Sequence, residues 1–215
     1  MNIQKEEEEK VGDNMPNWCW NELTITGDSN SISKFKKKAA EKPPYWDYDD
    51  DYSKSKLHFS NFITPPIDLV YEEQTLDEPF KRRKYDGDVK RSMEIIMLVS
   101  TGRGEEIIPD NLYDWEFINW GCKWGANDAY IKEEREDTLV YIFDTPWDPP
   151  REFVVKVSKM YPKLRFHLVF DEPGNLIGGN MTAMKGEKTQ EKYLQAEEYE
   201  NEYREQDEES EEDQG

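Results

Sequence analysis

An α+β protein is predicted, with an antiparallel-rich sheet and helices packed on one face. Stretches rich in β-branched and aromatic residues alternate with segments of helical spacing. Several of the strand-like stretches return through short turns, which favours antiparallel pairing. The predicted order is strand, helix, strand, helices, two strands, helix and two strands. Such strand–helix–strand units are those of ferredoxin-like folds.

The first half of the chain begins with a predicted strand, Trp18–Ile25, in which threonines add β-propensity. Asp28 or Ser29 can cap the helix that follows, Ser31–Glu41, and two prolines end it. A second strand is predicted at Leu57–Ile63, closed by Thr-Pro-Pro. Weaker signals predict an exposed acidic loop at Tyr45–Lys56 and a helix at Val89–Thr101.

The second half has clearer signals. Asp110 or Asn111 can cap a helix over Asp110–Trp120, and Gly121 fits its C-terminal end. Asp148 is interpreted as a cap in front of a second helix, which starts with proline. The remaining predicted elements are strands Asp128–Glu134 and Thr138–Thr145, helix Pro150–Tyr161, and two strands in Leu164–Gly186 around a turn at Glu172–Asn175.

Charge divides the chain into a body and two extensions. The 215 residues carry a net charge of −20. Residues 187–215 hold thirteen acidic and three basic groups, and they have little apolar surface to bury. We therefore predict a disordered extension at 1–14, one domain at 15–186, and an acidic tail at 187–215 that is largely disordered or transiently helical.

Five ordered motifs resemble a known family. They are MPNWCWNELTITG, FITPPIDL, YDWEFINWGCKWGA, FDTPWDPP and PKLRFHLVFDEPGNLIGG. In order and spacing they are similar to phage and plasmid proteins with a YubB-type ferredoxin-like domain, over about Met15–Glu187. The resemblance implies that fold and a small accessory protein of a virus or mobile element. It implies no established reaction, and Cys122 and the TPWDPP stretch depart from the family pattern.

Tryptophans supply the candidate binding residues. Trp18 and Trp20 share one face of a strand, and we expect them to form the floor of the core under a helix. The alternative is an exposed platform that stacks bases or a flat ligand. A second candidate group follows the predicted helix, where Lys123 can donate to a carbonyl, contact a ring or hold an anion. The candidate ligand-binding set is Trp18, Trp20, Asn119, Trp120, Lys123, Trp124 and Trp147.

Catalytic chemistry finds little support in the sequence. His58 and His167 lie in separate apolar stretches, and we interpret both as strand residues with satisfied hydrogen bonds. Cys19 has no evident base partner. Asn17, Asn21 and Asn119 are interpreted as partners of backbone groups. We predict no catalytic residues, no metal site and no cofactor, so an enzyme ranks last among the functional classes.

The leading functional prediction is a non-enzymatic binding protein. Its acidic body and tail would be attracted to a host or viral protein with a basic surface, such as a nucleic-acid-handling factor. The alternative is a small-molecule or nucleotide-binding domain with a tryptophan-rich cleft. Direct nucleic-acid binding is disfavoured because residues 16–186 are themselves acidic. The location expected is the host cytoplasm, since the chain has no membrane-length apolar run.

Overall fold

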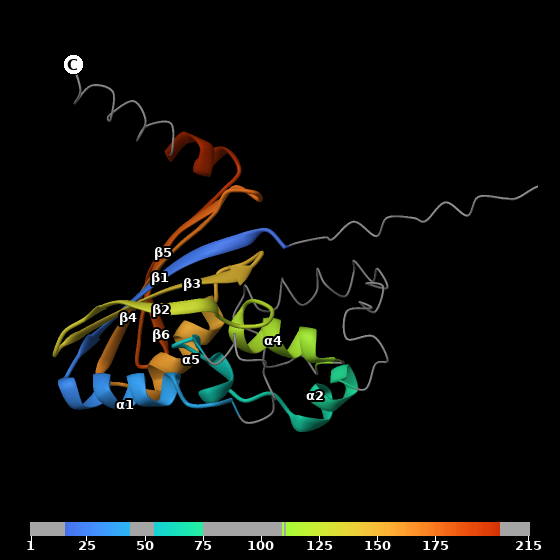
Figure 1. Cartoon of the computed structure of the whole chain (residues 1–215). Helices are drawn as coiled ribbons and strands as arrows, with labels where there is room; N and C mark the ends of the chain where they lie inside the picture. Colours follow the sequence, from blue (N-terminus) through green and yellow to red (C-terminus); the bar gives the residue numbers. More distant parts are fainter. Residues whose placement is uncertain (1–15, 44–53, 75–108, 110, 203–215) are drawn as a thin grey trace, which may run out of the picture.

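The fold is organised around an antiparallel sheet whose strands lie in the order β2-β3-β1-β4-β5-β6 (Figure 1). The structure is a computed structural model that describes residues 16–43, 54–74, 109 and 111–202. This arrangement confirms the predicted α+β class. The strands are β1 Trp18–Gly27, β2 Asn127–Glu134, β3 Thr138–Pro146, β4 Leu164–Glu172, β5 Ile177–Met184 and β6 Glu187–Gln195.

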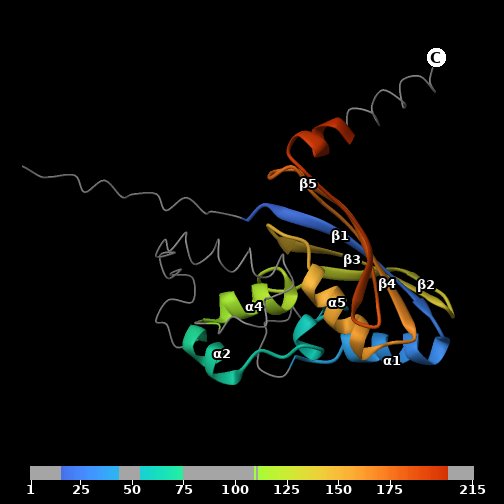
Figure 2. The same ribbon diagram turned by 180° about the vertical axis from the view of Figure 1, so that it is seen from behind.

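The helices of the body lie on one side of this sheet, as predicted (Figures 1 and 2). The apolar stripes of α1 and α5 pack on the sheet, and α4 packs against α5. The opposite side of the sheet, which α1 and α5 leave uncovered, is called the open face below. The helices in the described residues are α1 Ser29–Ala39, the 3₁₀ turn η2 Phe59–Asn61, α2 Ile67–Gln74, α4 Leu112–Trp120 and α5 Arg151–Met160.

Aromatic side chains fill the space between sheet and helices. Phe35 of α1 stacks on Phe62 with ring centroids 4.8 Å apart, and its edge meets Tyr161. Phe59 stacks on Phe153 of α5 at 3.8 Å. Rings in these arrangements stabilise the core beyond the area that they bury. Aromatic residues therefore make up much of the core between sheet and helices.

Two of the three predicted helix caps are present. The side chain of Asp28 accepts from the backbone N–H of Ser31 at the start of α1, and that of Asn111 accepts from Asp114 at the start of α4. Gly121 ends α4 in the left-handed conformation, with φ 84°. The third cap, Asp148, was predicted wrongly. Pro150 is the N-cap of α5, and no side chain caps that end.

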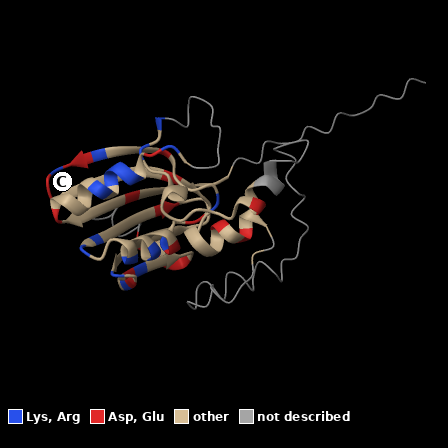
Figure 3. Cartoon of the chain, turned by 90° about the horizontal axis from the view of Figure 1, so that it is seen from below, with Lys and Arg blue, Asp and Glu red and all other residues tan. Residues whose placement is uncertain are grey.

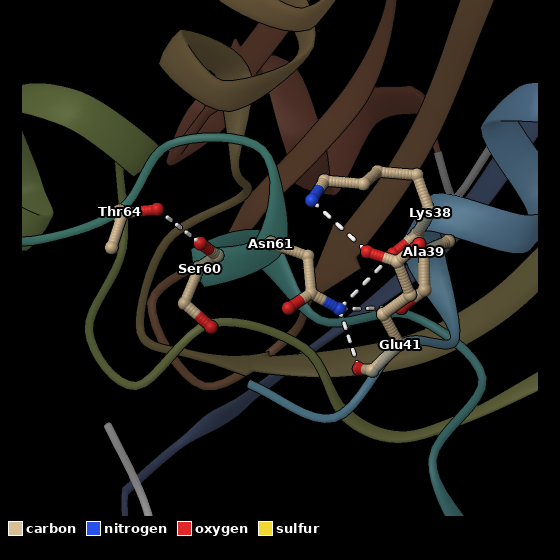
Figure 4. Close-up of polar contacts among 6 residues, drawn as sticks. All are labelled: Lys38, Ala39, Glu41, Ser60, Asn61 and Thr64. Carbon is tan, nitrogen blue, oxygen red and sulfur yellow. Dashed lines mark hydrogen bonds and ion pairs between the residues drawn. The ribbon is translucent and has the colours of Figure 1, made fainter. Parts of the chain in front are cut away.

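Leu57–Ile63 is not the strand that its apolar pattern predicts. Its central residues form η2, and the polar side chains of this buried turn hold the end of α1 instead of facing solvent. The Asn61 amide donates to the carbonyls of Lys38, Ala39 and Glu41 at 3.1, 3.3 and 2.6 Å (Figure 4). These carbonyls are among those that a helix end leaves without partners. Tertiary hydrogen bonding thus overrides the strand pattern.

The predicted boundary between body and tail was also wrong. Residues 187–195 form β6, which pairs with β5 along its length, and residues 197–202 are helical. The salt bridge of Arg151 with Glu191 joins β6 to α5, at 3.2 Å. Arg151 also lies over the ring of Tyr193, 4.4 Å from its centroid. Pairing and cross-contacts therefore order a segment that its composition alone assigns to a tail.

Several predictions lie outside the described residues. These are the disordered extension at 1–14, most of the acidic loop, the helix at Val89–Thr101 and the end of the tail, 203–215. In the described part, α2 is a helix that the sequence did not predict.

Replacing Asn61 with alanine tests the cap of α1. We expect the free energy of unfolding to fall by about 1–3 kcal/mol, because buried and partly buried carbonyls lose the hydrogen bonds that the Asn61 amide donates. Asn30→Ala is the control, since Asn30 is exposed on the same helix and should change stability by at most about 0.5 kcal/mol. Urea denaturation of both variants measures the difference. Equal stability of Asn61→Ala and the wild-type protein would contradict this role.

Candidate functional site

The structure separates the predicted site residues into three groups. Trp18 and Trp20 lie on the open face, Trp120 and Asn119 belong to α4, and the remaining three lie around the loops at the ends of α4 and β3. The first and third groups adjoin each other. Trp18 pairs with Pro146, and the backbone N–H of Trp147 donates to the carbonyl of Asn17 at 2.8 Å.

Trp18 and Trp20 are not the floor of the core, so this expectation was wrong. Their exposed fractions are 41% and 39%. The residues between and after them, Cys19 and Asn21, face the helices and are completely buried. The Asn21 amide donates to the carbonyl of Cys19 at 2.8 Å and to the Thr145 hydroxyl at 2.9 Å, so a polar side chain is satisfied inside. The indoles are consequently left on the open face.

Carboxylates flank Trp20 on both neighbouring strands. Trp20 is opposite Asp144 of β3 and opposite Asp171 of β4. Directly opposite residues share a face of the sheet, with Cβ atoms about 5 Å apart. Burial and repulsion by Asp128 raise the pKa of Asp144 above its usual range. The open face therefore combines exposed indoles with negative charge.

The basic residues of the open face lie away from the two tryptophans or in ion pairs. Arg165 is opposite Thr26 at the other end of β1, and Lys192 is paired with Glu202. The lysines between positions 34 and 38 belong to α1 and so lie on the helix-covered side of the sheet, which Figure 3 shows from below. On the open face, Lys132 is paired with Glu22 at 2.6 Å. The lysines of α1 are thus separated by the sheet from Trp18 and Trp20.

Trp124 and Trp147 form an aromatic pair near the start of β1. Their ring centroids are 5.7 Å apart, and 44% of Trp124 is exposed. Lys123 lies 3.5 Å from the ring centroid of Tyr113 and 5.2 Å from that of Trp147. This confirms a ring contact for Lys123, although neither of the two indoles that bracket it in the sequence is the one that it contacts.

Both tryptophans of this pair have left-handed backbone conformations. Their φ angles are 57° and 64°, which are costly for bulky residues. Hydrogen bonds to surrounding residues offset the cost of these backbone conformations. The backbone N–H of Trp124 donates to the carboxylate of buried Glu116 at 3.1 Å, and that of Trp147 donates to Asn17. The loops therefore hold the two rings together at the expense of local strain.

Trp120 and Asn119 have structural environments. Only 2% of Trp120 is exposed, and its indole N–H donates to the carbonyl of Ile63 at 3.1 Å. The Asn119 amide donates to the carbonyl of Trp115, and its oxygen accepts from Lys156. The interpretation of Asn119 and Asn21 as partners of backbone groups is confirmed. Neither Trp120 nor Asn119 is placed to contact a ligand on the open face.

The two cysteines and His58 are buried, and His167 is partly buried. Burial raises the pKa of both thiols, Cys19 and Cys122, which disfavours a thiolate nucleophile at neutral pH. Burial lowers the pKa of both imidazoles. His167 is a strand residue next to the Thr182 hydroxyl, as expected, whereas His58 precedes η2 and is not in a strand. Across the described ranges, no group of three His, Cys, Asp or Glu side chains could hold a metal ion.

Sequence reasoning missed three residues beside Trp20: Asp144, Asp171 and Tyr199. The two aspartates could not be identified as neighbours of Trp20, because the sequence did not predict the register of the strands. Their alternation with buried residues does indicate that they lie on the open face. Tyr199 was assigned to the tail. Its hydroxyl donates to the Asp171 carboxylate at 2.9 Å, and only 6% of the residue is exposed. The helical residues 197–202 thus contact one margin of the open face.

Asp148 directly follows Trp147 and lies in a partly buried environment. Burial raises its pKa to about 6, and Glu172 adds to the rise while Arg151 opposes it. A carboxyl whose pKa is higher in the folded state than in the unfolded state stabilises the fold below the unfolded value, 3.8, and loses this contribution as the pH rises through about 6.

Asp148→Asn should therefore be more stable than the wild-type protein at pH 7, by up to about 3 kcal/mol. The advantage should shrink as the pH falls and vanish near the unfolded pKa, where the wild-type carboxyl is protonated in both states. Thermal denaturation of the two proteins across this pH range measures the difference. A less stable variant at neutral pH would show that the ionised carboxylate has a stabilising partner.

Across the described residues, no helix combines the length and the apolar character that a membrane crossing requires.

Comparisons with known proteins support the fold. Residues 120–213 match the model of a family described as the ferredoxin-like domain in Api92-like protein. This match covers a little less than half of the chain and extends beyond β6. It confirms the ferredoxin-like character that the sequence predicted. The predicted origin in a virus or mobile element stays a prediction.

One solved structure that resembles the chain is the crystal structure of protein Api92 from Yersinia pseudotuberculosis. The similarity covers 85% of this chain and 99% of that one, at 14% identity and a TM-score of 0.45, which is too low to carry an argument. A search of curated proteins gave no significant match. The chain is thus similar, over residues 120–213, to an uncharacterised ferredoxin-like domain of Api92-like proteins.

Proposed function

We propose that the protein is a non-enzymatic accessory protein that binds a partner protein through the open face near the start of β1. The observation that carries this proposal is the exposure of Trp18 and Trp20 side by side on one strand. Tryptophan is enriched among the residues that dominate binding energy at protein interfaces, because a large ring is desolvated when the partner docks. Exposing two of them has no benefit for the isolated fold.

Charge indicates a basic partner. Asp144 and Asp171 lie beside Trp20, and the whole chain has a net charge of −20. Complementary potentials increase association rates and select against acidic partners. An accessory protein of a virus or mobile element would meet such a surface on a host factor that handles nucleic acid, in the host cytoplasm. These last features rest on the sequence resemblance and on charge.

A small-molecule or nucleotide ligand is the second candidate, supported by the pair Trp124 and Trp147. Their rings are held at close distance by strained loops, which is a feature of functional sites. Phosphate recognition has less support, because the ammonium group of Lys123 is already engaged with two rings. Asp128 and Asp144 also add negative charge near these loops. A partner protein therefore remains the favoured occupant.

The double variant Trp18→Ala/Trp20→Ala should lose its partner while it keeps its fold, because neither indole belongs to the core. Affinity capture with tagged protein from lysate of the producing cells, followed by mass spectrometry, measures the loss. Met160→Ala is the matched control, since Met160 is 51% exposed on α5, away from the open face. We expect proteins with basic surfaces that Met160→Ala retains and the double variant loses. The same captured set with all three proteins would contradict the proposal.

A further inference from the structure

We infer that the open face recognises an arginine side chain of the partner, with the guanidinium stacked on Trp20 and paired with Asp144. This inference rests on the proposed function and adds the chemical identity of the group that is bound. It draws on three independent features: the partners of the carboxylates on this face, the register of Trp20, and the position of Tyr199.

The Asp144 carboxylate has neither a cation nor a hydrogen-bond donor among the described residues. Glu22, on the same face, is paired with Lys132 at 2.6 Å. Asp171 accepts a hydrogen bond from Tyr199. Within the described part of the chain, the Asp144 side chain makes no hydrogen bond or ion pair, and its charged neighbour is another acid, Asp128. A partly buried carboxylate in such a setting gains most from a cation that the partner supplies.

The register places an aromatic ring next to this carboxylate. Trp20 and Asp144 are directly opposite each other in β1 and β3, so their side chains rise from the same side of the sheet. A guanidinium is planar, stacks on aromatic rings and presents a fork of donors to a carboxylate, whereas an ammonium group is a strongly hydrated point charge. Trp20 and Asp144 therefore match arginine better than lysine, and they would repel phosphate.

Tyr199 occupies the other flank of Trp20. Its ring lies against Gly178, where a Cβ atom would be 3.0 Å from the ring, and its hydroxyl holds Asp171. Gly178 and Asp171 are paired in register beside Trp20. The chain itself thus fills the β4–β5 flank of the indole. The β3 flank, with Asp144, is left for the arginine of the partner.

Nuclear magnetic resonance titration tests this inference with two probes, a short glycine-flanked arginine peptide and its lysine counterpart, at about 150 mM NaCl. We expect the arginine peptide to shift the Trp20 indole N–H resonance saturably and to bind several-fold more tightly than the lysine peptide. Asp144→Asn should weaken arginine binding by about tenfold, because a charged pair is lost. Asp137→Asn is the control, with the same charge change in an exposed turn at the other end of the sheet.

Asp128→Asn gives a second variant, since asparagine tolerates the left-handed backbone at this position, φ 50°. It should weaken arginine binding less than Asp144→Asn does. Equal affinity for the two peptides, no response of Trp20, or unchanged binding by Asp144→Asn would each overturn the inference. Any of these results combined with loss of partner capture by the tryptophan double variant would leave the proposed function standing. Retained capture by that double variant would instead refute the proposed function.

Discussion

The alternation of side chains along β1 is the constraint on which the rest of the structure depends. β1 is a central strand, paired with β3 on one side and β4 on the other. The face of the sheet that each β1 side chain occupies therefore fixes the face occupied by the opposite side chains of β3 and β4. Leu23 and Ile25 face the helices and are completely buried. A slip of one residue would expose them and bury Trp18 and Trp20. Asn21 adds specificity, because only this register brings the Thr145 hydroxyl of β3 within hydrogen-bond distance of its buried amide.

Local chemistry made much of the fold predictable. Caps at Asp28 and Asn111 and the glycine after α4 located helix ends, and alternation located five of the strands. Long-range contacts account for the failures. The donors of Asn61 find carbonyls about twenty residues earlier in the chain, so an apolar alternating segment becomes a 3₁₀ turn. β6 is polar enough to suggest a tail, but β5 supplies its hydrogen bonds.

The candidate site was predictable in composition but not in arrangement. The sequence indicates that the tryptophans are important. Trp18 and Trp20 are exposed because Asn21 lies on the opposite, buried face of β1, although hydrophobicity alone would assign an asparagine to the surface. Only the register of the strands shows that Asp144 and Asp171 are the neighbours of Trp20. The strained loops that carry Trp124 and Trp147 extend the aromatic surface beyond the N-terminal end of β1. Around the start of β1, the uncovered side of the sheet is thereby both acidic and aromatic.

Hydroxyl-radical oxidation with mass spectrometry tests most directly whether helices cover one side of the sheet and leave the tryptophans of β1 exposed. Trp18, Trp20 and Trp124 should be oxidised readily in the native protein, because more than a third of each is exposed. Trp115 and Trp120 should be protected until the protein unfolds. Protection of Trp18 and Trp20 to the same degree as Trp120 would contradict the account, since β1 would then present its indoles to a covered face.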